Sequence, residues 1–307
     1  MPQTMDWAGK GLTALPASLE RLTALEELDL DRNALAALPD WIGGLTNLTS
    51  LSLYRNQLTT LPASLWQLTR LQTLNLAENR LTALPEGIGN LVNLTMLDLG
   101  HNALAALPAA LGRLRELAFL YLSDNQLTGL PTAYETLGSL RYLNITHNRL
   151  TVVPELIGNL TQLVEFRLYN NQIATLPAAL GALNGLRELH LMNNRLVALP
   201  AAIGRLRALK RLDLQDNRLT ALPESIGELT QLTDLNLRNN QVAALPAAVG
   251  NLRNLRYLDL RANRSIMLPE TLAELPNLEK LDLRWTKLSP LPTWLKRLSG
   301  RGCVVYT

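Results

Sequence analysis

The sequence predicts an α/β solenoid, with a parallel sheet along one side and short helical segments along the other. Three repeating features support this prediction. Asparagine recurs every 23 residues, leucines precede each asparagine at fixed offsets, and a Leu-Pro pair followed by Ile-Gly or a close variant comes after it. The asparagines are Asn33, Asn56, Asn79, Asn102, Asn125, Asn148, Asn171, Asn194, Asn217, Asn240 and Asn263.

Residues 71–93 illustrate the strand half of one repeat. Leu74 and Leu76 alternate with polar residues and predict a short strand whose leucines point inward. Strands of successive repeats then stack in parallel about 4.8 Å apart. Asn79 follows the strand, and we expect its amide to satisfy backbone groups in its own turn and in the next repeat. Each such group would otherwise be buried and unpaired, at a cost of about 1–3 kcal/mol.

The second half of the same repeat predicts the helical side. Leu81 and Leu84 continue the core, and Pro85 is expected to be the first helical residue because its missing N–H needs no partner there. Ile88 and Gly89 belong to a short turn of α- or 3₁₀-helix, and Gly89 lets neighbouring repeats approach closely.

Three repeats depart from the pattern. Trp66 stands where most repeats have glycine, and Tyr134 with Glu135 replaces an Ile-Gly pair. We interpret Trp66 and Tyr134 as packing residues, with a contact site on the helical side as the alternative. Ser265 replaces an inward apolar residue, so Ile266 is expected to turn inward.

The ends of the chain predict caps for a single domain spanning residues 1–307. A degenerate cap covers residues 1–24, twelve full repeats cover 25–300, and a last strand lies within 301–307. Trp7 and Trp294 are expected to cover the ends of the core, because terminal repeats have one face in water. Cys303 is expected to be a buried apolar residue.

The pattern L-x-x-L-x-L-x-x-N-x-L-x-x-L-P-x-x-I-G-x-L resembles the intracellular class of leucine-rich repeats. That class occurs in Ras-suppressor and Scribble-type scaffolds, plant Ras-group proteins and many bacterial proteins. The resemblance covers roughly residues 5–298 and implies a horseshoe with the sheet on its concave surface. Because the class shares a scaffold and not a ligand, the resemblance names no partner.

Composition excludes several functional classes. The net charge is only +3, although the pI is about 9.1, so no basic nucleic-acid footprint is evident. A single cysteine excludes an intrachain disulfide and favours a reducing compartment. No signal peptide or bilayer-spanning stretch is recognisable, so we expect a cytoplasmic protein without membrane or nucleic-acid partners. The alternative, if the protein is an effector, is secretion by a route that needs no signal peptide. No catalytic or metal-ligand motif is present, so neither an enzyme nor a cofactor is predicted.

The non-leucine residues at the third, fifth, seventh and eighth positions of each repeat are expected to face the concave surface. Seven of the 14 aromatic residues and all three histidines fall in these four columns. Clustered aromatics with polar neighbours are typical of binding surfaces, whereas the alternative is that Tyr and Phe simply suit strands. The predicted partner-binding patch comprises Met96, His101, Phe119, Tyr121, Asp124, Tyr142, His147, Tyr169, His190 and Met192.

Within this patch His101, Asp124 and His147 occupy one column of consecutive repeats. We interpret them as a polar ladder. A pH-sensitive partner contact is a weaker hypothesis, and no metal site is predicted there.

Charge is graded along the same surface. Arg238, Arg261 and Arg284 share a column near the C-terminal end, beside Asp259 and Asp282. They form either a mutually neutralised Arg–Asp ladder or a contact for an anion or acidic peptide. The first repeat is acidic, with Glu26, Glu27, Asp29 and Asp31. We expect a monomer, and opposite polarity at the two ends allows partner steering or weak head-to-tail association.

The leading functional hypothesis is a protein–protein recognition module or scaffold that binds a protein or peptide on the concave surface. Two alternatives stay open at this point. One is a bacterial effector or immunity-related protein that acts on host proteins, and the other is an engineered repeat scaffold.

Overall fold

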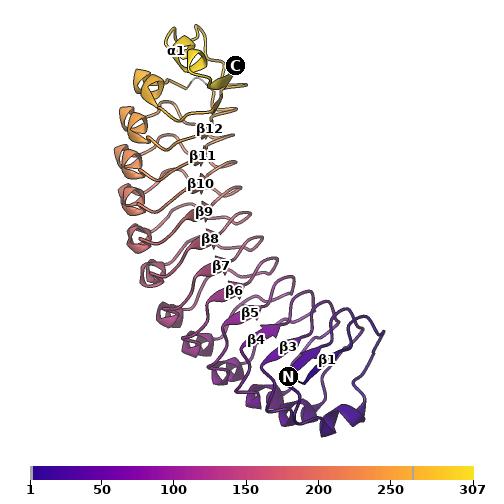
Figure 1. The fold of residues 1–307 in the computed structure, drawn as a ribbon. Helices are drawn as coiled ribbons and strands as arrows, with labels where there is room; N and C mark the ends of the chain where they lie inside the picture. Colours follow the sequence, from indigo (N-terminus) through magenta and orange to yellow (C-terminus); the bar gives the residue numbers. More distant parts are fainter. Residues whose placement is uncertain (1–2, 265) are drawn as a thin grey trace. The chain divides into compact units, whose positions relative to one another are not determined.

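The computed structural model describes residues 3–264 and 266–307, so Ser265 lies outside the described residues. The chain divides into two compact units, Met1–Arg149 and Leu150–Thr307. Both units repeat the same unit of structure, a short strand followed by a turn and a helical segment (Figure 1). This architecture confirms the predicted solenoid.

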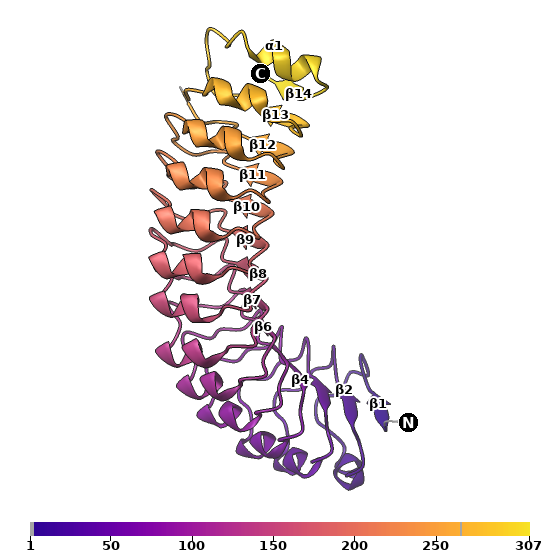
Figure 2. The same cartoon turned by 60° about the vertical axis from the view of Figure 1, so that its left-hand side comes forward.

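In its described residues, from Gln3 onward, the first unit contains seven strands, each paired in parallel with the next. Six 3₁₀-helices lie on the side opposite these strands, between consecutive strands in the sequence (Figure 2). The strands are β1 (Thr4–Asp6), β2 (Glu27–Asp29), β3 (Ser50–Ser52), β4 (Thr73–Asn75), β5 (Met96–Asp98), β6 (Phe119–Tyr121) and β7 (Tyr142–Asn144). The 3₁₀-helices are η1 (Ala17–Arg21), η2 (Asp40–Gly44), η3 (Ala63–Gln67), η4 (Glu86–Asn90), η5 (Ala109–Arg113) and η6 (Thr132–Thr136).

The second unit repeats this arrangement and ends with one α-helix, α1 (Leu295–Gly300), and a final strand. Its strands also pair in parallel in sequence order. They are β8 (Glu165–Arg167), β9 (Glu188–His190), β10 (Arg211–Asp213), β11 (Asp234–Asn236), β12 (Tyr257–Asp259), β13 (Lys280–Asp282) and β14 (Val304–Tyr306). The 3₁₀-helices are η7 (Glu155–Asn159), η8 (Ala178–Ala182), η9 (Ala201–Arg205), η10 (Glu224–Glu228), η11 (Ala247–Asn251) and η12 (Glu270–Glu274). Among the described residues, no helix has the length and hydropathy that crossing a bilayer requires.

The core of each unit lies between the strands and the 3₁₀-helices. In β5 the central Leu97 is fully buried, whereas Met96 and Asp98 on either side of it are half-buried. This alternation confirms the inward direction predicted for the strand leucines. The 3₁₀-helices contribute residues such as Ile88, which has no exposed surface.

The recurring asparagine joins neighbouring repeats through buried hydrogen bonds. Asn125 Oδ1 accepts a bond of 3.0 Å from the N–H of Leu104. Its Nδ2 donates to the carbonyl oxygens of Leu99, Leu122 and Ser123 at 2.9, 3.3 and 3.1 Å. Leu99 and Leu104 belong to the preceding repeat, so the prediction of contacts with the next repeat was wrong in direction. The turn that contains each asparagine is therefore fastened onto the turn before it.

The proline of each repeat lies one position before the helix that it was expected to begin. Pro85 has φ −66° and ψ 153°, which is extended backbone, and the helix starts at Glu86. The Pro85 carbonyl accepts a bond of 3.2 Å from the N–H of Ile88. Proline suits this N-cap position because its φ is already fixed and no donor is required there.

The departures on the helical side are packing features. A Cβ atom added at Gly89 would lie 2.7 Å from the carbonyl oxygen of Ala110, so glycine permits the close approach of η4 and η5. Trp66 occupies the equivalent place in η3 and lies over Gly87, whose missing side chain leaves room for the indole. The exposed fractions of Trp66 and Tyr134 are only 5% and 2%, so neither offers a contact site on the helical side.

Residues near the two ends differ in burial. Trp7 and Trp294 are half-buried, and Cys303 is buried. Ile266 is also buried, as expected for a residue that turns inward. At the end of the asparagine column Thr286 donates to the carbonyl oxygen of Leu283 at 2.7 Å, a bond within its own turn.

Removing one asparagine should weaken the contact between two repeats. We expect Asn125→Ala to lower the free energy of unfolding by about 2–4 kcal/mol, because buried backbone groups that lose a partner cost about 1–3 kcal/mol each. Urea denaturation monitored by circular dichroism measures this change. Asn90→Ala, at an exposed asparagine that ends η4, should stay within about 0.5 kcal/mol of the wild type. Equal effects of the two substitutions would contradict the role assigned to Asn125.

The residue before each recurring asparagine, and before Thr286 at the end of that column, has left-handed backbone, with φ between 50° and 62° at the twelve positions from Arg32 to Trp285. Ala262 has φ 59° and lacks the side chain with which Asn or Asp tolerates this conformation. We expect Ala262→Gly to raise the free energy of unfolding by about 0.5–1 kcal/mol. Glycine removes the steric cost of a Cβ atom in left-handed backbone, but it loses more conformational entropy on folding than alanine does. Thermal unfolding tests this expectation. Asn239→Gly at the same position of the preceding repeat should give a smaller gain or none.

Candidate functional site

The outer face of the strands is the candidate binding surface, and we call it the sheet face. Each three-residue strand presents its first and third residues there, which are the third and fifth positions of the repeat. The seventh and eighth positions follow the strand. The eighth lies in the left-handed turn described above, so these two columns border the sheet and are not part of the strands.

Many polar residues of the fifth column have a structural role. Asp98 Oδ1 accepts a bond of 2.9 Å from the N–H of Gly100, two residues later. Equivalent bonds are made by Asp29, Asn75, Asn144, Asp213, Asn236, Asp259 and Asp282. Such a side chain ends the strand by pairing a backbone donor that the ladder leaves free. The abundance of Asp and Asn in this column is therefore accounted for by turn chemistry.

Aromatic residues occupy the sheet face of β6 and β7, beside Met96 of β5. Tyr121 and Tyr142 lie on adjacent strands, with ring centroids 4.8 Å apart and ring planes inclined at 39°. Phe119 is 40% exposed, and Met96 on β5 is paired with it in the strand register. A tilted pair at this separation is a favourable aromatic geometry. The first unit thus brings four of the predicted contact residues together on adjacent strands.

The histidines of the first unit flank one carboxylate. His101 Nε2 lies 3.4 Å from Asp124 Oδ2, and His147 Nδ1 lies 3.7 Å from Asp124 Oδ1. All three residues occupy left-handed turns beside the aromatic strands. The imidazoles are about half exposed, so this pairing adds little stability. The arrangement is the polar ladder predicted from their shared column.

The second unit holds the rest of the predicted patch, Tyr169, His190 and Met192. Tyr169 and Met192 are half-buried, at seventh positions that border the sheet. His190 is buried, and its Nε2 lies 3.0 Å from Glu188 Oε2 and 4.0 Å from Glu165 Oε1. His190 therefore offers a partner little surface, and its imidazole is held by the strands themselves.

Glu165, Glu188 and His190 are also the residues that could hold a metal ion in the described part of the chain. One potential ligand atom from each lies within 4.8 Å of the others. However, the Nε of Arg167 is 2.5 Å from Glu165 Oε1, so a guanidinium already neutralises this carboxylate. An ion-pair network across β8 and β9 accounts for the cluster.

The three arginines of the C-terminal column have different surroundings. Arg261 pairs with both oxygens of Asp259 at 2.5–3.0 Å and lies 3.5 Å from Asp282. Arg284 pairs with Asp282 at 2.7 Å. Asp282 is fully buried, and its pKa is lowered by Arg284 and Arg261 against the opposing effect of burial. Of the two predicted alternatives, the neutralised Arg–Asp ladder describes Arg261 and Arg284. Arg238 is half-buried.

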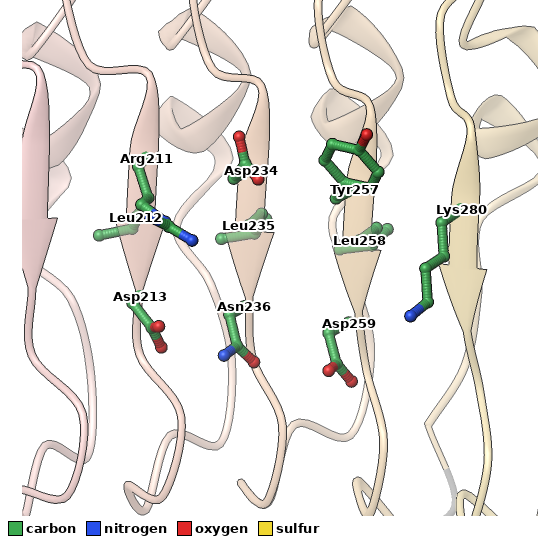
Figure 3. Close-up of a pocket in the computed structure, with 10 residues that line it drawn as sticks. All are labelled: Arg211, Leu212, Asp213, Asp234, Leu235, Asn236, Tyr257, Leu258, Asp259 and Lys280. Atoms are coloured by element: carbon green, nitrogen blue, oxygen red, sulfur yellow. The ribbon is translucent and has the colours of Figure 1, made fainter.

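A hollow of about 240 Å³ opens on the sheet face of β10 to β13 (Figure 3). The residues that line it with polar side chains are Arg211, Asp213, Asp234, Asn236, Tyr257, Asp259 and Lys280. Asp213, Asn236 and Asp259 form a row at the ends of their strands, while the side chain of Arg211 reaches toward β11 and that of Lys280 leans toward Asp259. Sequence reasoning assigned none of these residues to the site. The sequence shows mixed charge in the third column, to which Arg211, Asp234 and Lys280 belong. Mixed charge along a column does not predict a hollow in the surface.

Comparisons with known proteins agree on one family. A model of the leucine rich repeat matches residues 23–81, 69–127 and 138–196, and a model of a leucine-rich repeat region matches residues 178–255. A solved leucine-rich repeat protein of Leptospira interrogans is 30% identical, with a TM-score of 0.67, over 100% of this chain and 96% of that one. No match is found among curated protein sequences.

Two further structures resemble the chain. The plant peptide hormone receptor RGFR1, solved in complex with RGF2, is 29% identical with a TM-score of 0.78. The alignment covers 92% of this chain but 51% of the receptor chain, so this chain spans about half the receptor's length. An internalin of Listeria monocytogenes has a TM-score of 0.84 over 99% of this chain and 86% of its own, but at 24% identity it shows the fold alone.

Burial of Asp98 predicts a pH-dependent effect on stability. Burial raises the pKa of this carboxyl, opposed by the N–H of Gly100 and by His101. The folded-state pKa of Asp98 therefore exceeds the unfolded value of about 3.9. Protonated Asp98 makes its full contribution to the free energy of unfolding below about pH 3.9, and this contribution is lost as pH rises through the folded-state pKa. Asp98→Asn should therefore raise the free energy of unfolding at pH 7 and change it little at pH 3.

Urea denaturation at the two pH values tests this prediction. Asparagine keeps the acceptor for the Gly100 N–H, as Asn75 and Asn144 do in other repeats. Asp6→Asn is the matched control, because exposed Asp6 makes the same bond to the N–H of Ala8. A gain at pH 3 equal to that at pH 7 would contradict the proposed cause.

Proposed function

This chain belongs to the leucine-rich repeat family, and we propose that it is a recognition module that binds a partner protein or peptide on its sheet face. Members of this family share a scaffold, so the partner must be argued from the residues displayed on it. Two regions of the sheet face are available for such an argument. One is the aromatic region of the first unit, and the other is the hollow of the second.

The observation that carries the proposal is the aromatic region formed by Phe119, Tyr121 and Tyr142. The Tyr121–Tyr142 pair has ring centroids 4.8 Å apart, and Phe119 is 40% exposed beside it. Large, rigid aromatic side chains give much contact area and lose little conformational entropy on binding. Binding energy in protein interfaces concentrates at Trp, Tyr and Arg near the centre of the contact.

The surroundings of this region suit the edge of an interface. His101, Asp124 and His147 line one side with polar groups that are about one third to one half exposed. An apolar centre with a polar rim is the usual anatomy of a protein interface. The complex of RGFR1 with RGF2 supports a ligand of the peptide class, since that receptor shares the fold over 92% of this chain.

The experiment is affinity capture from a cell lysate with mass spectrometry, followed by binding measurements between the purified chain and the captured partner. We expect the double variant Phe119→Ala, Tyr121→Ala to weaken binding at least about 10-fold, since the loss of a hot-spot residue costs about 2 kcal/mol or more. Val92→Ala is the control, because Val92 is 47% exposed but follows η4 on the helical side.

The double variant must melt like the wild type for this comparison to count. Unchanged affinity for a folded double variant would refute the assignment of binding to the aromatic region.

A further inference from the structure

The hollow on the second unit has the size of one or two side chains. Its volume of about 240 Å³ lies below the roughly 300–1,000 Å³ typical of small-molecule sites. It is bounded by four adjacent strands, β10 to β13, and is open to solvent along the sheet face (Figure 3). A depression of this size fits side chains of an extended segment of a partner better than a separate small molecule.

Some charges around the hollow are already neutralised. Asp259 is bound by Arg261 through both carboxylate oxygens. Lys280 lies 3.9 Å from Asp282 and 5.2 Å from the ring centroid of Tyr306. A ligand charge would therefore gain less electrostatic free energy from pairing with Asp259 or Lys280 than from pairing with a group that has no such partner.

Arg211 and Asp234 differ from these groups. Within residues 3–264 and 266–307 neither has an ion-pair partner within 4.0 Å, although they lie on adjacent strands and both line the hollow. Asp234 Oδ2 accepts a bond of 2.6 Å from the hydroxyl of Thr233, which orients the carboxylate. Below them the Asp213 carboxyl is partly buried, and burial raises its pKa. Arg211 acts at longer range on Asp213, and Asp234 acts at longer range on Arg256. Among the described residues, the hollow thus presents one cation beside one carboxylate, neither of which is held in a salt bridge.

Tyr257 gives the hollow a fixed aromatic surface. Its hydroxyl donates to Glu279 Oε2 at 2.9 Å, and the same glutamate pairs with Arg256 at 2.7 Å. The Arg256 guanidinium lies 5.4 Å from the centroid of the Tyr257 ring, and Tyr257 is still 39% exposed. A ring held in this way is pre-organised to contact an alkyl chain, so little entropy is lost when a ligand binds.

We propose that the hollow recognises two opposite charges in an extended segment of the partner protein. A carboxylate of the segment binds Arg211, and an ammonium or guanidinium binds Asp234 with its alkyl stem against Tyr257. Side chains on one face of an extended segment are about 6.6–6.8 Å apart, and neighbouring strands are about 4.8 Å apart. In this structure the Arg211 side chain points toward β11, so on binding it turns away from Asp234 to make up this difference. The acidic and basic residues of the segment are then two positions apart. This inference rests on the proposed function.

The test is selection of a displayed library of random dodecapeptides on the purified full chain, run in parallel on Asp234→Lys and Arg211→Glu. We expect peptides from the wild type to contain an acidic and a basic residue two positions apart in a fixed order. Asp234→Lys should select an acidic residue in place of the basic one, and Arg211→Glu a basic residue in place of the acidic one. Such inversions cannot come from misfolding, which would only abolish selection. Asp40→Asn, at the exposed start of η2, is the control and should select the wild-type peptides.

A synthetic peptide of the selected sequence gives the quantitative measurement. Replacing its basic residue with Glu should weaken binding to the wild type at least about 10-fold, or about 1.4 kcal/mol, and should restore binding on Asp234→Lys. Selected peptides that lack the charge pair, or that bind both reversal variants unchanged, would overturn this inference. So would a selection on the wild type that enriches no peptide. The proposed function is judged separately, by the captured partner and the variants at Phe119 and Tyr121.

Discussion

The side-chain amide that follows each strand is the interaction on which the rest of the structure depends. A solenoid turn buries backbone N–H and C=O groups that have no partner in a regular ladder. One asparagine satisfies them in two repeats at once, as Asn125 does for Leu122 of its own repeat and for Leu104 and Leu99 of the preceding one. No other side chain of this length offers both donors and an acceptor on one planar group. These bonds require each turn to overlie the previous one closely.

This constraint also decides which residues are free to serve function. The eighth position must adopt left-handed backbone to bring the asparagine inward, and the fifth position often ends the strand by accepting a hydrogen bond, as Asp98 does from Gly100. The third position has neither task. It is there that the exposed Phe119, the anchored Tyr257, and Arg211 and Asp234 of the hollow are found.

The two units therefore present different chemistry on the same scaffold. The first unit displays aromatic surface bordered by His101 and His147. The second displays paired and unpaired charges around a small hollow. Aromatic contacts contribute most to affinity, whereas charge placement contributes most to specificity and to the rate of encounter. A recognition module that uses both regions would divide these two properties between them.

The sequence by itself determined the fold and the direction of the strand leucines. These features follow from periodicity and burial, which are local and repeat in every unit. It also placed the aromatic residues of the first unit correctly, because a column of a regular repeat becomes a row on the sheet.

Only the tertiary structure decided which polar residues of the four outward-facing columns are already held in ion pairs within the chain. His190, a predicted contact residue, is buried against Glu188, and Arg261, for which the sequence left a ladder and a partner contact open, is bound to Asp259. The repeat pattern likewise does not predict the hollow that lies between Arg211 and Lys280. Pairing and depth depend on side-chain conformations across several strands, and a one-dimensional repeat does not encode the distances between them.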